Sequence, residues 1–228
     1  MKLSSVVPWG RSFEEYCEMF ALTDRDLNKK ILGCADGPSA FNAVLSDRGG
    51  HITSIDPIYR FSRQELRVRI AEVYDEIMGK VELEKNLYVW NSIPSVEVLG
   101  RVRMEAMQAF LNDYDNGKQE GRYIEGQLPR LALKDKSFNL ALCSHFLFLY
   151  SEQFSIDDHV VSVLELCRVA REVRIYPLLS LDGRESVHLD PVLEELAGRQ
   201  ISFSRNPVAY EIQKGAREML VIRQNNRV

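Results

Sequence analysis

The chain has 228 residues, of which 45% are hydrophobic and 27% charged, a balance typical of a globular protein with a substantial core. Its 33 acidic and 29 basic residues give a net charge of −4, which argues against a nucleic-acid partner because such proteins normally carry a basic patch. No stretch approaches the ~18 apolar residues of a membrane span, and no apolar signal core opens the sequence. The four cysteines form no Cys-x-x-Cys pair, so we expect reduced thiols in one cytoplasmic domain over residues 1–228, without a membrane partner.

The N-terminal region predicts an arm followed by a short helix. Pro8–Arg11 precedes the helix and can fold over a neighbouring site. Ser12 is a good N-cap, and Glu15 three positions later completes a capping box, so a helix is expected over Ser12–Phe20. A second turn-and-helix signal follows at Thr23–Asp26.

An apolar strand, a turn of small residues, a helix and a second strand come next. The strands are expected at Lys30–Cys34 and His51–Ile55, and the helix at about Pro38–Asp47. Small turn residues let the backbone approach a ligand closely, and the helix start offers free N–H groups. Asp56 ends the second strand 19 residues after Gly37, about the spacing at which an acid accepts hydrogen bonds from ribose hydroxyls. This pattern predicts a nucleotide-binding α/β domain, with a plain strand-to-helix turn as the alternative.

Two long helices are expected where a minimal fold of this kind would lead quickly to its third strand. Apolar residues recur at helical spacing over Ser62–Met78 and Ser95–Asp115, which predicts a helical insertion over about residues 62–118. We interpret the insertion as packed over the ligand edge of the sheet, where such folds place substrate selection. The alternative is that both helices simply cover one face. The apolar stripe of the second helix is expected to be Val98, Val102, Ala106, Ala109 and Phe110. The arginines after the second strand are interpreted as a solvated helix face, with a local basic patch for nucleic acid as the alternative: Arg60, Arg63, Arg67 and Arg69.

The rest of the chain alternates strands with helices. The strands are expected at Arg122–Ile124, Asn139–Cys143, Glu172–Tyr176, Val208–Gln213 and Met219–Arg223, with helices at about Ile156–Val169 and Asp190–Ala197. This alternation predicts a doubly wound, mainly parallel sheet with helices on both faces. Ligands then lie outside the carboxyl ends of the strands. The turns at residues 33–39, 56–57, 126–128 and 144–145 all fall at such ends.

A late motif strengthens the nucleotide-binding interpretation. Gly126-Gln127-Leu128-Pro129 leads through Leu131-Ala132-Leu133 to Asp135-Lys136-Ser137-Phe138-Asn139 and a strand. Together with the alternating small residues after the first strand, this run resembles the class I S-adenosylmethionine-dependent methyltransferases, and the resemblance covers nearly the whole chain. In that family the first strand ends in acid-x-Gly-x-Gly-x-Gly, and a later Gly-Asp-Ala turn carries the adenine contact. Gly37 keeps its place, whereas four positions depart from the pattern: Gly33 at the acid, Ala35 and Ser39 at glycines, and Gln127 at the adenine-contacting acid.

The resemblance implies a seven-stranded α/β fold with an antiparallel C-terminal strand, S-adenosyl-L-methionine as cofactor, and methyl transfer to a small-molecule acceptor. Asp56 is then expected to hold the ribose, Gln127 the adenine amine, and Arg11 the cofactor carboxylate. Asp36 is expected to orient the turn or to contact the amino group of the cofactor, with a simple turn residue as the alternative. The full set of implied cofactor contacts is Arg11, Gly33, Ala35, Asp36, Gly37, Asp56, Pro57, Gln127, Leu128 and Ser144.

His145, directly after the fourth strand, is the candidate general base; the alternative is that its ring only shapes the pocket. Tyr16 and Tyr150 are weaker candidates. No metal site is expected, because the four histidines are scattered. Two other functions stay open: a catalytically silent cofactor-binding or interaction protein on the same fold, and a nicotinamide-dependent oxidoreductase.

Overall fold

The computed structural model describes residues 9–223 of the chain. Seven strands form one sheet in the order β3-β2-β1-β4-β5-β7-β6. The strands are β1 (Lys30–Cys34), β2 (His51–Ile55), β3 (Tyr123–Ile124), β4 (Phe138–Ser144), β5 (Ala170–Tyr176), β6 (Ser202–Pro207) and β7 (Glu218–Arg223). The α-helices are α1 (Phe13–Met19), α2 (Asp24–Leu27), α3 (Phe41–Asp47), α4 (Arg63–Leu83), α5 (Val96–Gln119), α6 (Ile156–Val169) and α7 (Leu189–Gly198), with short 3₁₀ helices η1 (Pro57–Arg60) and η2 (Lys85–Leu87).

The sheet is mostly parallel. The pairings of β1 with β2 and β4, of β2 with β3, and of β4 with β5 are all parallel. Strand β7 runs antiparallel to both β5 and β6. The predicted doubly wound, mainly parallel sheet with an antiparallel C-terminal strand is therefore confirmed.

Helix starts are fixed by local side-chain caps. The predicted capping box of α1 is present, since Ser12 Oγ accepts from the Glu15 N–H and the Glu15 carboxylate accepts from the Ser12 N–H. The same device starts α4 at Ser62 and α6 at Ser155. Each cap satisfies N–H groups that the first helical turn leaves without partners.

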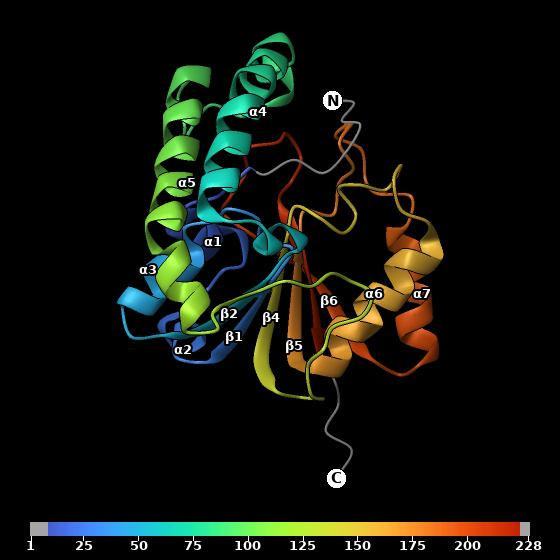
Figure 1. Cartoon of the computed structure of the whole chain (residues 1–228). Helices are drawn as coiled ribbons and strands as arrows, with labels where there is room; N and C mark the ends of the chain where they lie inside the picture. The colour runs from blue at the N-terminus through green and yellow to red at the C-terminus, as the bar shows by residue number, and fades with distance from the viewer. Residues whose placement is uncertain (1–8, 224–228) are drawn as a thin grey trace.

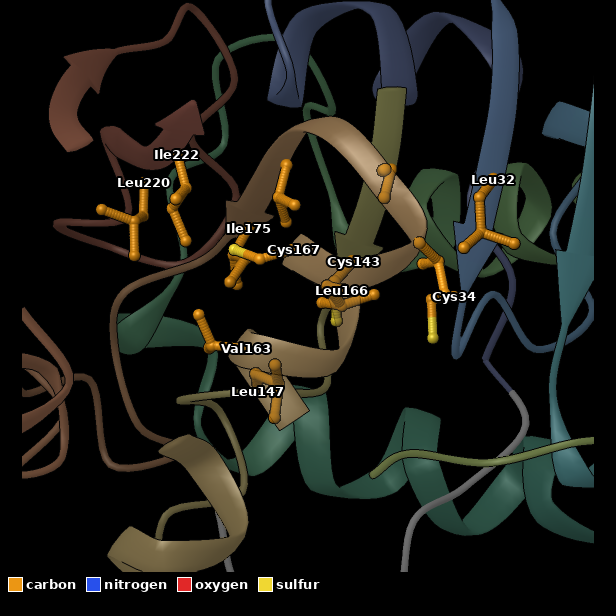
Figure 2. Packing of buried hydrophobic residues seen from close by; sticks show 14 of the residues in the cluster. Leu32, Cys34, Cys143, Leu147, Val163, Leu166, Cys167, Ile175, Leu220 and Ile222 are labelled. Atoms are coloured by element: carbon orange, nitrogen blue, oxygen red, sulfur yellow. The ribbon is translucent and has the colours of Figure 1, made fainter. Parts of the chain in front are cut away.

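Helices cover both faces of the sheet (Figure 1). On one face, side chains of β1, β4, β5 and β7 pack against α6 and α7, and Figure 2 shows Val163, Leu166 and Cys167 of α6 among the strand residues. On the other face, α1 and α3 pack with the apolar sides of α4 and α5 against a second cluster that includes Ile31 and Leu142. The apolar burial on both faces makes the sheet a rigid platform whose strand ends can hold a site.

The two helices of the predicted insertion lie side by side (Figure 1). Helix α5 contacts α3 and β3, while its outer partner α4 packs mainly on α5. A third cluster joins η1 to α5 and β3 through Tyr59, Phe110, Tyr114 and Tyr123. The insertion therefore covers one face of the sheet, and residues of both helices also reach the carboxyl edge, so each of the two predicted arrangements holds for part of it.

Three predicted features are wrong. The helix expected from Pro38 begins at Phe41, because Ser39 Oγ accepts the Phe41 N–H and holds the preceding residues in a turn. The sixth strand is Ser202–Pro207, whereas the expected segment Val208–Gln213 is a loop with a single isolated bridge, at Gln213. The buried stripe of α5 is rotated from the expected one and includes Leu99, Arg103, Ala106, Met107 and Phe110. Across residues 9–223, no helix combines the length and apolarity that a bilayer crossing requires.

Candidate active site

A cavity of about 400 Å³ opens at the carboxyl edge of the sheet, within the usual size range for small-molecule sites. The turns after β1, β2 and β4 form its floor, and side chains from α1, α4 and α5 form its walls. It adjoins a smaller hollow of about 80 Å³ that shares several lining residues with it. The two are called here the main lobe and the small lobe. All of the predicted cofactor residues except Gly33 line the main lobe, as does His145.

Asp56 lies at the end of β2, in the wall of the main lobe. One carboxylate oxygen accepts the Gly37 N–H at 2.9 Å and the other accepts the Ile58 N–H at 2.9 Å. An ionised carboxylate offers about four acceptor positions, so both oxygens retain capacity for hydroxyl donors. Burial raises the pKa of Asp56 to about 6, against the lowering effect of the two N–H groups.

Asp36 is a second buried acid in the same wall. Its oxygens accept the Tyr16 hydroxyl at 2.9 Å and the Ser54 hydroxyl at 2.6 Å, and burial raises its pKa to about 7. The carboxyl group stands directly over Gly33, where a Cβ atom would overlap it. Gly33 thus provides the space that Asp36 occupies. The resemblance implied that Gly33 contacts the cofactor, but Gly33 does not line the cavity.

The turn between these acids presents backbone to the main lobe. Ala35 and Gly37 have positive φ angles of 58° and 56°, and a Cβ at Gly37 would meet no atom. The Ala35 N–H donates to the Ile55 carbonyl at 2.8 Å, which ties the turn to β2. Across the lobe lie Pro57 at the start of η1, and Gln127 and Leu128 from the loop before β4. A flat ring seated there would meet the Gln127 amide and the apolar Leu128 side chain.

His145 follows β4 with a positive φ of 53° and lines both lobes. Its Nδ1 lies 2.9 Å from Ser144 Oγ, and its backbone N–H donates to the Tyr176 carbonyl. Burial lowers the pKa of His145 well below its usual range, and the charges of Arg11 and Arg103 lower it further. The ring is therefore neutral at pH 7 and has a lone pair able to accept a proton. Of the weaker candidates, Tyr16 is committed to Asp36, and Tyr150 lines the main lobe.

A buried ionic cluster that sequence reasoning missed stands beside His145. Arg103 Nη1 donates to Glu15 Oε2 at 2.5 Å, and the Tyr210 hydroxyl donates to Glu15 Oε1 at 2.6 Å. The signal in the sequence was an arginine inside the apolar stripe of α5. Arg11, the predicted carboxylate contact, lies in both lobes close to this cluster; Pro8 of the predicted arm lies outside the described residues.

The strand order, the antiparallel β7 and the cavity at the carboxyl edge define the class I methyltransferase fold. The solved structure of WbdD superposes with a TM-score of 0.50 over 92% of this chain and 39% of WbdD, at 13% identity. Another of its structures describes WbdD as a bifunctional kinase-methyltransferase. The chain is also similar to the magnesium protoporphyrin IX methyltransferase ChlM of Synechocystis PCC 6803, which was solved with bound SAM. That alignment covers 93% of this chain and 80% of the ChlM chain, at 10% identity and a TM-score of 0.46.

In sequence, the chain is similar to a protein of the archaeon Methanocaldococcus jannaschii. The two are 33% identical over 225 residues, which cover 98% of this chain and 99% of the relative. The relative is the uncharacterized protein MJ0045, and this chain belongs to the same family. No protein-family model matches the sequence.

Proposed function

We propose that the protein is an S-adenosylmethionine-dependent methyltransferase that acts on a small-molecule acceptor. The observation that carries this proposal is the buried Asp56 carboxylate, which faces the main lobe from the end of β2 with acceptor capacity left on both oxygens. The description of WbdD, which shares the fold, as a kinase-methyltransferase supports it.

The residues of the main lobe fit this cofactor. Asp56 accepts the ribose hydroxyls, and the backbone at Ala35 and Gly37 permits close approach of the chain beyond the ribose. Gln127 accepts from the adenine amine, Pro57 and Leu128 pack on the ring, and Ser144 bounds the far end. Asp36 fixes the turn through Tyr16 and Ser54. The bound cofactor supplies an activated methyl group on a sulfonium with a good leaving group.

The protein's own contribution is to hold the acceptor in line and to remove a proton where the acceptor carries one. Orientation of this kind can account for about 7–11 kcal/mol of a barrier. His145 lines both lobes, and in the tautomer whose Nδ1–H donates to Ser144 Oγ, its Nε2 is the proton acceptor. The charges of Arg11 and Arg103 disfavour an imidazolium there, so the proton must pass on to solvent or to another base.

Calorimetric titration with S-adenosylmethionine and S-adenosylhomocysteine tests the proposal. Each hydrogen bond to a charged group contributes about 1.5–3 kcal/mol, so Asp56→Ala is expected to weaken both ligands at least tenfold. Asp47→Ala, which removes an exposed carboxylate at the end of α3, is the matched control and should bind as the parent does. Absence of binding to folded, ligand-free protein would overturn the proposal, and binding without turnover over a broad acceptor panel would favour the silent protein.

A further inference from the structure

Arg11 lines both lobes, and Arg103 lines the main lobe, where Glu15 is its ion-pair partner. Arg103 is 1% exposed; Nη1 is bound to Glu15, Nη2 donates to the Tyr210 hydroxyl at 3.3 Å, and the buried Nε has no partner. Arg11 donates from Nη1 to the Trp9 carbonyl at 2.8 Å, and its Nε is also buried without a partner. Glu15 is therefore committed to Arg103.

Among residues 9–223, Arg11 forms no ion pair with a carboxylate, and Glu15 acts on it through its charge from beyond contact distance. Burial and the neighbouring charge of Arg103 both lower the pKa of Arg11. Glu84 also lines the small lobe, but the carboxylate whose charge acts on Arg11 is Glu15. Taking a cation out of water without an ionic partner is unfavourable, and an anionic ligand would remove that penalty.

Arg11 faces the acceptor side of the cavity. Its charge lowers the pKa of His145 and acts to lower those of Tyr88 and Tyr176, which lie on that side. In the wall of the main lobe, burial raises the pKa of Asp56 against two backbone N–H groups, and burial and the charge of Asp56 raise the pKa of Asp36 against two hydroxyls. Arg11 therefore lies where the two lobes meet, with His145 and Tyr88, which also line both.

The rest of the small lobe is lined by apolar and polar side chains. The apolar ones are Leu87, Leu149, Leu181 and Ile212, and the others are Glu84, Tyr88, His145, Tyr210 and Gln213. Its volume of about 80 Å³ compares with about 30 Å³ for one water in the liquid, so it admits a group of a few heavy atoms. A carboxylate or a phosphate oxygen pair matches the planar fork of a guanidinium, which can donate two parallel hydrogen bonds.

We propose that the small lobe binds the anionic end of the methyl acceptor, a carboxylate or phosphate on a largely apolar body, with Arg11 as its counter-ion. This inference rests on the proposed function, because only methyl transfer in the main lobe makes the neighbouring ligand an acceptor. Arg103 and Tyr210 bind the two oxygens of Glu15, which is then not available as an ion-pair partner for Arg11.

The test uses simple probes on protein saturated with S-adenosylhomocysteine. Benzoate and phenyl phosphate represent the two anions, and benzyl alcohol and phenol are their neutral counterparts. Calorimetry is expected to show binding of at least one anion, with affinity at least tenfold above that of its neutral counterpart. Whichever anion binds more tightly identifies the headgroup. Equal binding of charged and neutral probes, or no binding of either anion, would overturn the proposal.

Arg11→Gln separates an acceptor site from a cofactor contact. We expect it to weaken the anion at least tenfold and to leave the affinity for S-adenosylhomocysteine within twofold of the parent. The exposed Arg101→Gln on α5 is the matched control and should change neither. If Arg11 instead holds the cofactor carboxylate, the variant will weaken the binding of S-adenosylhomocysteine but not that of 5′-methylthioadenosine, which lacks that group.

If S-adenosylhomocysteine does not bind the parent protein, the proposed function fails on its own, and the anion titrations are read on the unliganded protein.

Discussion

At the residue scale, the end of β1 shows a glycine and an acid that depend on each other. Gly33 takes the position at which the resembling family has its acid, and the Asp36 carboxyl group fills the space above it. Two hydroxyls, from Tyr16 on α1 and Ser54 on β2, hold that carboxyl group in place. An acid is thus present in this region of the cavity, although it arrives from the turn instead of the strand.

Gly33→Ala should therefore be destabilising through Asp36. The added methyl group would displace the carboxyl group and break its two hydrogen bonds, a loss of about 2 kcal/mol in the free energy of unfolding. In an Asp36→Ala background the same substitution should cost less than half as much, because nothing remains to be displaced. Urea unfolding of the two single variants and the double variant gives the coupling energy. Strict additivity would contradict the dependence.

Asp56 predicts a pH-dependent affinity for the cofactor. Ribose hydroxyls donate to the ionised carboxylate, so binding favours the deprotonated form and the affinity should rise as the pH increases through about 6. Calorimetric titration with S-adenosylhomocysteine from pH 5 to pH 8 measures this rise. Asp56→Asn should remove this rise in affinity. Asp36→Asn removes a carboxyl group with a pKa of about 7, so it should remove only the part of the rise that occurs near pH 7. A flat profile for the parent protein would show that Asp56 is not a ribose contact.

At the scale of elements, Tyr114 is one of the residues that anchor the helical insertion to the site. The Tyr114 hydroxyl of α5 donates to the carbonyls of Tyr59 and Phe61, both at 2.9 Å, and so fixes η1 immediately after Asp56. Tyr114→Phe should lower the free energy of unfolding by about 1–2 kcal/mol, because it leaves buried carbonyl groups with fewer donors. Tyr74→Phe on α4 removes the same atom from a hydroxyl that makes no hydrogen bond to residues 9–223, and it should be nearly neutral. Denaturant melts of both variants check the difference.

Elements with a strong local signal could be predicted from sequence alone. Strands β1 and β2 match their expected bounds because each is an apolar run bounded by polar or turn residues, and α6 matches because Ser155 caps an amphipathic run. The sixth strand could not be found this way. Strand β6 lies at the sheet edge, pairs only with β7 and is half exposed, so its sequence lacks an apolar signature. The apolar Tyr210 and Ile212 that suggested a strand instead serve the cavity wall.

In the candidate site, too, the residues of a local motif could be predicted and those far apart in the sequence could not. Asp56 and Gly37 belong to one local motif, and their spacing was enough to bring them into one prediction. Glu15, Arg103 and Tyr210 are separated by 88 to 195 positions and meet only because α1, α5 and the loop before β7 converge over β4 and β5. No local pattern encodes such a meeting, which explains why the ionic cluster was missed.

At the scale of the whole molecule, the main lobe is the place where the insertion and the sheet meet. Ile77 and Val81 of α4 and Leu99 of α5 form one wall, while the turns after β1, β2 and β4 form the floor. Helix α4 touches the rest of the fold chiefly through α5, so without ligand it should open locally at lower free energy than the sheet. A ligand that fills the lobe contacts both this wall and the floor and must therefore stabilise the insertion against the sheet.

Amide hydrogen exchange measures that coupling directly. S-adenosylhomocysteine at 100 times its dissociation constant should raise the free energy of global unfolding by about 2.7 kcal/mol. We expect added protection in α4 and the first half of α5 as well as in the turns after β1 and β2, because the ligand bridges them. Asp56→Ala under the same ligand concentration should show little of either effect. Protection confined to the turns would mean that the helices only cover the sheet face and do not close on the ligand, whereas protection of α4 would give the insertion a direct part in enclosing the methyl-transfer site.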